Sequence, residues 1–152
     1  MKLTKTLLIT LMICFFALTG CSNDKRVPVS GQITINGEPL SLATVEFIPV
    51  DQTALNTRAG ANTDKDGAFS IPKSRGLEPG EYVVTVYASI SFDTQTKELA
   101  TTETSLGNMY TKVLTPPEYN DKSTLRFTIS AKEKNHFTCD VISKVSRNFD
   151  EK

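Results

Sequence analysis

Few side chains in this sequence could do chemistry. His136 is the only histidine, and the three cysteines are Cys14, Cys21 and Cys139. A zinc site takes three or four ligands drawn from histidine, cysteine and carboxylates, and a serine nucleophile needs an imidazole base within hydrogen-bond reach. No catalytic motif surrounds His136. We therefore expect a surface histidine, no catalytic residues, no metal, no cofactor and no enzyme activity.

Carboxylates offer one further candidate, a calcium loop. Asn62, Asp64 and Asp66 have the spacing of its first half. The position that should supply a bidentate glutamate is Lys73, and the sequence predicts no flanking helices. Aspartates in such a Gly-containing segment commonly accept backbone N–H groups in a β-turn. We expect that turn role for Asp64 and Asp66, without a metal.

The chemistry of Cys21 is of a different kind. Two lysines near the N-terminus precede an apolar run at residues 7–18, as in a signal peptide. The run is shorter than the ~20 apolar residues that a membrane-spanning helix needs. It ends in Leu18-Thr19-Gly20-Cys21, which resembles the bacterial lipobox. The resemblance implies cleavage between Gly20 and Cys21 and a diacylglyceryl group on the Cys21 thiol; an ordinary secretory signal with a chance cysteine is the alternative.

A lipid on Cys21 would anchor the mature protein. Each buried methylene contributes about 0.8 kcal/mol, so two or three acyl chains give a durable anchor. Residues 21–26 are then a short polar tether that keeps the domain close to the bilayer. Ser22 after the cysteine is compatible with sorting to the outer membrane. We expect a lipid-anchored protein of the cell envelope, facing the periplasm or the cell surface.

The amino-acid composition limits the classes of partner that the protein could bind. Removing residues 1–20, which contain Lys2 and Lys5, leaves 15 basic and 17 acidic side chains. Such a balance gives no basic face for nucleic acid, and the remaining length suits one domain with its own core.

Cys139 has no partner for an intrachain disulfide once Cys14 is cleaved off and Cys21 is lipidated. Its alternation with neighbouring apolar residues predicts a small core residue.

Hydrophobic periodicity predicts an all-β domain. Apolar residues alternate with polar ones in short runs separated by turn residues, and no window after residue 20 keeps a helical period. This pattern is typical of a single antiparallel Greek-key sandwich. We expect the domain at residues 27–145, a long loop or folded insertion at 91–123, and a polar tail at 146–152. The seven predicted strands are residues 29–35, 43–47, 57–63, 69–71, 82–88, 125–129 and 137–141.

Three motifs carry a family resemblance. They are Val29-Ser30-Gly31-Gln32-Ile33 with Asn36-Gly37-Glu38-Pro39-Leu40, then Thr63-Asp64-Lys65-Asp66-Gly67-Ala68-Phe69, and Leu77-Glu78-Pro79-Gly80-Glu81-Tyr82. Together they resemble the carboxypeptidase regulatory-like domain, which has a transthyretin-like β-sandwich. Residues 116–125 are similar, more loosely, to small bacterial lipoproteins that consist of this domain alone. The resemblance implies a non-catalytic accessory module.

The leading functional hypothesis is a non-enzymatic, membrane-anchored β-sandwich that binds an envelope protein or polymer. One alternative is a carbohydrate-binding module that stacks sugars on Tyr87, Tyr110 or Tyr119, since the chain has no tryptophan. A second alternative is a hydrolase like some transthyretin-like relatives. Those relatives use several histidines and basic residues in a shared site, which a chain with one histidine does not match.

Overall fold

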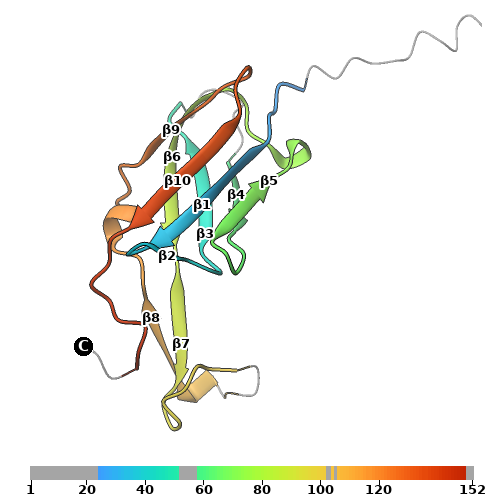
Figure 1. The fold of residues 1–152 in the computed structure, drawn as a ribbon. Helices are drawn as coiled ribbons and strands as arrows, with labels where there is room; N and C mark the ends of the chain where they lie inside the picture. The colour runs from blue at the N-terminus through green and yellow to red at the C-terminus, as the bar shows by residue number, and fades with distance from the viewer. Residues whose placement is uncertain (1–23, 52–57, 102–103, 105, 150–152) are drawn as a thin grey trace, which may run out of the picture.

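The computed structural model describes residues 24–51, 58–101, 104 and 106–149, and Figure 1 shows an elongated β-structure in these ranges. The described residues contain ten strands and three short 3-10 helices. The strands are β1 (Val29–Ile35), β2 (Glu38–Pro39), β3 (Thr44–Pro49), β4 (Ala59–Asn62), β5 (Ala68–Ile71), β6 (Gly80–Tyr87), β7 (Ser89–Asp93), β8 (Met109–Val113), β9 (Arg126–Ile129) and β10 (Asn135–Val141). The 3-10 helices are η2 (Lys73–Arg75), η3 (Leu106–Asn108) and η4 (Pro117–Tyr119).

Two four-stranded sheets form a sandwich. One has the order β10-β1-β2 with β5 also paired to β1, and the other has the order β4-β3-β6-β9. The predicted all-β sandwich is confirmed. Its strands alternate as their sequences require: β6 buries Tyr82, Val84 and Val86 while Val83 and Thr85 stay half-buried.

The strand inventory differs from the sequence prediction in two ways. The seven predicted strands correspond to β1, β3, β4, β5, β6, β9 and β10, but β2, β7 and β8 were not foreseen. Both residues of β2 are exposed, and β7 and β8 lie outside the sandwich, so none of the three needs a regular apolar face. The second difference is direction: β10 pairs with β1 in parallel, whereas the other strand pairs among the described residues are antiparallel.

The core between the sheets is built around Phe47 of β3. Its fully buried ring lies 6.1 Å from Phe69, 6.2 Å from Phe127 and 5.9 Å from Phe137, measured between ring centroids. Phe69 and Phe137 belong to the opposite sheet, so the contacts join the two layers. Tilted and edge-to-face ring pairs of this kind add about 0.5–1.5 kcal/mol each beyond the burial of their surface.

Polar side chains fix the turn between β1 and β2 to the end of β10. Asp140 Oδ1 accepts hydrogen bonds from Thr34 Oγ1 at 2.6 Å and from Gly37 N at 2.9 Å. These two bonds lower the pKa of Asp140 below its ordinary value, the Thr34 bond having the larger effect. Asn36 adds a pair of bonds to the backbone of Ser143. The parallel strand pair is thereby held in register at this end.

The two ends of the sandwich carry different segments. At one end the chain enters β1, next to η2 and the turn between β9 and β10. At the opposite end the hairpin of β7 and β8 projects beyond the sheets, and the chain after β10 runs toward it (Figure 1). The hairpin and the beginning of the described chain therefore lie at opposite ends of the domain.

A substitution at Gly31 tests how closely β1 packs against its neighbours β5 and β10. A Cβ atom at this position would overlap the carbonyl oxygen of Phe137 and the ring of Phe69. Gly31→Ala should therefore lower the free energy of unfolding by about 2 kcal/mol or more, as overpacked core substitutions do. Gly107→Ala is the matched control, because a Cβ there meets nothing within 4 Å. Urea unfolding measures both, and equal stability of the two variants would contradict this packing.

Candidate functional site

The predicted cleavage and lipidation residues, Gly20 and Cys21, lie outside the described residues. The described chain begins at Asp24, which forms an ion pair with Arg26 at 2.8 Å. Val27 and Leu77 then exchange backbone hydrogen bonds of 2.8 and 3.1 Å, which fasten the chain to the end of the sandwich. Within the described ranges, no helix is long and apolar enough to cross a membrane.

The segment of residues 91–123, for which the sequence allowed a loop or a folded insertion, contains ordered structure in its described parts. β7 and β8 pair from Ser89↔Val113 to Asp93↔Met109. We call residues 89–113 the arm. A bridge between Phe92 and Leu99 folds the chain after β7 back against the outer edge of that strand.

The two faces of the arm differ in composition, and the large apolar side chains of β7 lie on one of them. Ile90 and Phe92 of β7 lie opposite Lys112 and Tyr110 of β8, so these four side chains share a face. The other face is mixed: Met109 and Val113 lie on it beside polar side chains, and the hydroxyls of Ser91 and Thr111 share a hydrogen bond of 2.8 Å there.

The C-terminal segment covers the face of the arm that carries Phe92. The ring of Phe149 lies 5.6 Å from Phe92 and 6.2 Å from Tyr110. Lys112 Nζ donates hydrogen bonds to the carbonyl oxygens of Ser146 and Asn148, at 3.2 and 2.6 Å. Phe92 is only 3% exposed although it is not part of the sandwich core. The burial of Phe92 therefore depends on the arm and the C-terminal segment, which lie outside the two sheets of the sandwich.

An open groove of about 830 Å³ lies where the arm meets the C-terminal segment. Its apolar lining comes from Ile90, Phe92, Leu99 and Phe149. Charged side chains, including Lys97 and Arg147, also line it. Leu99 is 60% exposed. The arm thus offers an apolar surface with a charged border, which is the composition of a protein-binding surface.

The three candidate tyrosines lie in different surroundings. Tyr87, at the end of β6, and Tyr110, on β8, are 45% and 48% exposed. Tyr119 is half-buried against the core, and its hydroxyl accepts a hydrogen bond of 3.2 Å from Ile142 N. No ring contact joins any two of these tyrosines in the described structure. The rings of Tyr87 and Tyr110 are therefore accessible to a ligand, whereas Tyr119 packs against the core.

The parallel pairing places Ser30 beside His136, a contact that the apolar pattern of the sequence does not predict. Ser30 Oγ and His136 Nδ1 are 3.1 Å apart on the exposed face of the sheet. The two residues are 106 positions apart in the chain. Among the described residues no partner binds the other ring nitrogen of His136, so no carboxylate orients the imidazole as in a catalytic triad.

The aspartates and the remaining cysteine have structural roles in the described chain. Asp64 Oδ1 accepts hydrogen bonds of 2.9 Å from both Asp66 N and Ala68 N, which is the turn role expected from the sequence. The same expectation for Asp66 is wrong, because in the described structure its carboxylate binds Lys65 Nζ at 2.8 and 3.0 Å in place of a backbone N–H. Across the described ranges no three His, Cys, Asp or Glu residues gather as a metal site. Cys139 is half-buried against the core, and burial, with Asp140 nearby, raises the pKa of its thiol. A thiol with a raised pKa is a poor nucleophile.

Comparison with known proteins adds no relative. No protein-family model matches the chain, and no curated protein shows significant similarity to it.

The role of Phe149 as a cover can be measured. Phe149→Ala removes both ring contacts with the arm, so amide hydrogen exchange in β7 and β8 should accelerate about tenfold while the sandwich strands keep their protection. Val145→Ala is the matched control in the same segment, since Val145 makes no ring contact. Unchanged exchange in the arm of the Phe149 variant would show that other residues bury Phe92.

Proposed function

We propose that this protein is a non-enzymatic, lipid-anchored component of the bacterial cell envelope, whose β-sandwich presents the arm to a protein partner. The observation that carries the proposal is the position of the arm. It projects from the end of the sandwich opposite to the end where the described chain begins (Figure 1). A lipid anchor just before that beginning would place the arm at the end of the domain that is farther from the point of attachment.

The anchor rests on the sequence before the described residues. An apolar run of signal-peptide length ends in Leu18-Thr19-Gly20-Cys21, and the resemblance of this motif to the lipobox supports lipid attachment at Cys21. The resemblance of three motifs to the carboxypeptidase regulatory-like domain supports an accessory, non-catalytic role. The exposed Ser30–His136 pair, without a third residue, gives little support to the hydrolase alternative.

The arm has the features expected of a binding element. Leu99, Tyr110 and Val113 are 60%, 48% and 42% exposed, so apolar area remains uncovered. Projecting elements outside a core tolerate changes that a core does not, and binding residues are commonly placed on them. An envelope protein with an apolar surface patch is therefore the partner that the arm fits best.

Carbohydrate binding is a second candidate, favoured by one observation. Tyr87 and Tyr110 expose nearly half of their surface, and an exposed tyrosine ring can stack on a sugar. Tyr110 belongs to the arm, so a glycan ligand and a protein partner would share this surface. The crosslinking experiment below distinguishes them by the chemical nature of the captured species.

Lipidation is tested at the cysteine itself. Wild-type protein should carry the mass of a diacylglyceryl group on its N-terminal peptide and fractionate with membranes, whereas Cys21→Ser should lose the lipid. Cys14→Ser is the matched control, because that residue lies inside the predicted signal peptide and should leave lipidation intact. An unmodified wild-type peptide starting after residue 20 would indicate ordinary secretion instead.

The arm is tested by photo-crosslinking in cells. A photoreactive residue at Leu99 on the arm should capture one discrete protein, and the same residue at Leu42, which is 81% exposed on the sandwich, should not. With the photoreactive residue at Val113 instead, which is 42% exposed at the base of the arm and is kept in this variant, joining Ile90 to Lys112 with Asn-Gly, a two-residue hairpin turn, should abolish the adduct. The thermal midpoint should change little, because Phe92 and the rest of the removed hairpin lie outside the sandwich core. Identical adducts from both positions, or none, would contradict the proposal.

A further inference from the structure

The end of the sandwich where the chain enters is rich in basic side chains. Its described segments are residues 24–28, 50–51, 58, 72–79 and 130–134, which lie at the ends of strands that meet there. We call this surface the tether end. It carries seven basic residues, Lys25, Arg26, Arg58, Lys73, Arg75, Lys132 and Lys134, and four acidic ones, Asp24, Asp51, Glu78 and Glu133.

The opposite end of the sandwich has no such excess of positive charge. Its segments, residues 36–43, 63–67, 114–125 and 142–149, carry five acidic residues, Glu38, Asp64, Asp66, Glu118 and Asp121, and four basic ones, Lys65, Lys122, Lys144 and Arg147. The mature chain as a whole has more acidic than basic side chains. The positive charge at the tether end is therefore a local feature that the overall composition hides.

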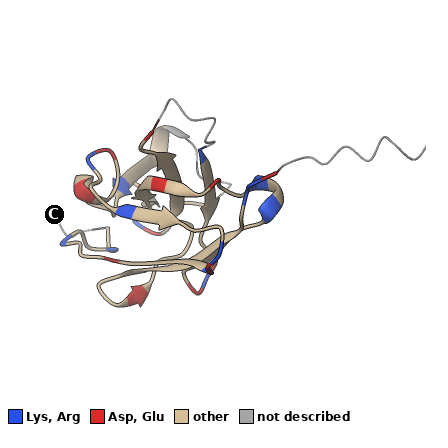
Figure 2. Cartoon of the chain, turned by 90° about the horizontal axis from the view of Figure 1, so that it is seen from above, with Lys and Arg blue, Asp and Glu red and all other residues tan. Residues whose placement is uncertain are grey.

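Most of the basic side chains at the tether end form no close ion pair in the described structure, although Asp24 attracts Lys73 as well as Arg26. Arg26 pairs with Asp24, but in the described structure no ion pair within 4.0 Å involves Lys73, Arg75, Lys132 or Lys134. Figure 2 views the domain from this end and shows the basic residues of η2 beside the point where the described chain begins.

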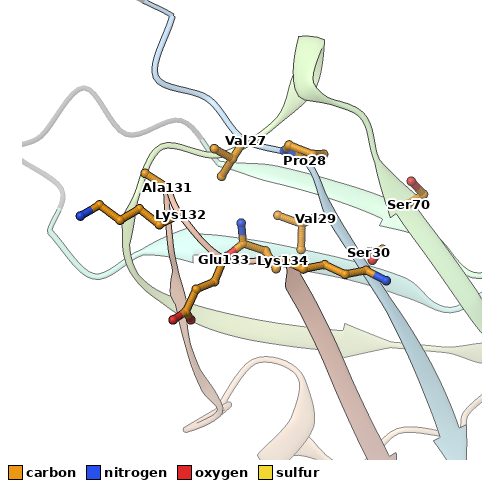
Figure 3. Close-up of a pocket in the computed structure, with 10 residues that line it drawn as sticks. Val27, Pro28, Val29, Ser30, Ser70, Ala131, Lys132, Glu133 and Lys134 are labelled. Atoms are coloured by element: carbon orange, nitrogen blue, oxygen red, sulfur yellow. The ribbon is translucent and has the colours of Figure 1, made fainter.

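A hollow of about 290 Å³ lies between the start of β1 and the turn that precedes β10. Val27, Pro28 and Val29 form part of its apolar lining, and Ser30 and Ser70 add hydroxyl groups. Figure 3 shows the Lys134 side chain extended toward Ser30, while Lys132 points to the other side. Ammonium groups thus flank a hollow with an apolar floor.

The proposed anchor limits how far this surface can lie from a bilayer. Three peptide units separate Cys21 from Asp24, so their Cα atoms are at most ~11 Å apart at ~3.8 Å per unit. The polar headgroup layer on each side of a bilayer is itself roughly 5–7 Å thick. Attraction of exposed charges to a surface decays over a Debye length of about 8 Å at physiological ionic strength. The tether end lies within that range whenever the domain turns this end toward the membrane.

We propose that the tether end is a membrane-facing surface whose basic side chains, Lys132 and Lys134 among them, contact the anionic headgroups of phospholipids. This inference rests on the lipid anchor of the proposed function and adds an orientation to it. The anchor alone would let the domain tilt freely on its short tether. Contact through the tether end holds the long axis upright and keeps the arm away from the bilayer.

The orientation is measured by energy transfer on the full, lipidated protein in vesicles. In a Cys139→Ser background, a donor dye is placed at Ser74→Cys in η2 or at Gln95→Cys in the arm, and an acceptor dye on lipid headgroups. With phosphatidylglycerol added to phosphatidylcholine, transfer should be high from position 74 and low from position 95. The difference should shrink on phosphatidylcholine alone and at high salt, because surface charges are screened.

Charge reversal shows whether electrostatic attraction, and not only the short tether, holds the tether end at the membrane. Lys132→Glu combined with Lys134→Glu should lower transfer from position 74 on anionic vesicles, since each basic residue lost near such a surface changes the equilibrium about fivefold. Lys65→Glu combined with Lys122→Glu makes the same change in charge at the opposite end and is the matched control. Circular dichroism before reconstitution should show both variants folded with wild-type unfolding midpoints.

Each other outcome overturns the inference in a distinguishable way. Equal transfer from positions 74 and 95, or no effect of reversal at Lys132 and Lys134, refutes the membrane-facing surface while the lipid mass on Cys21 preserves the anchor. Absence of that lipid mass refutes the anchor and the inference with it. A photoreactive residue at Ser74 that captures a protein in cells, with the adduct lost on charge reversal at Lys132 and Lys134 and energy transfer unchanged, would make the tether end a protein-binding surface.

Discussion

The parallel pairing of β1 with β10 is the constraint on which the arrangement of this molecule depends. Seven residue pairs, from Val29↔Asn135 to Ile35↔Val141, join the first strand of the sandwich to the last. Closing a chain segment of this length costs entropy, and a parallel pair is slightly weaker per residue than an antiparallel one. The pairing persists because the sheet it completes covers the core, with Phe137 of β10 packed on Phe47.

The direction of β10 also decides what lies at each end. Because β10 begins where β1 begins, the turn with Lys132 and Lys134 lies beside the start of the described chain. Because it ends where β1 ends, the residues that follow reach the arm, where Phe149 covers Phe92. An antiparallel β10 would exchange these two segments. One strand direction therefore underlies both the basic tether end and the covered face of the arm.

Two apolar clusters of different kinds result. The sandwich core around Phe47 joins two sheets and is tied down by buried polar contacts such as Thr63, whose hydroxyl bridges Leu40 O and Ala43 N. The cluster around Phe92 joins a two-stranded hairpin to a terminal segment. Isolated two-stranded hairpins are marginally stable in water, so the second cluster should open more easily than the first. A surface that can open without unfolding the domain suits the binding role proposed for the arm.

The sequence by itself determined the all-β class, most of the sandwich strands and the turn role of Asp64, because period-two alternation and turn chemistry are local properties of the chain. It also supplied the lipobox-like motif at Cys21, which needs no folded context to be recognised. Only the tertiary structure decided the direction of β10, the Ser30–His136 pair, the position of the arm and the burial of Phe92 by Phe149. Each of these joins residues distant in the chain, and alternation is the same for a parallel strand as for an antiparallel one. The apolar pattern therefore says which face of a strand is buried, and the packing of the two sheets decides beside which strand, and in which direction, it lies.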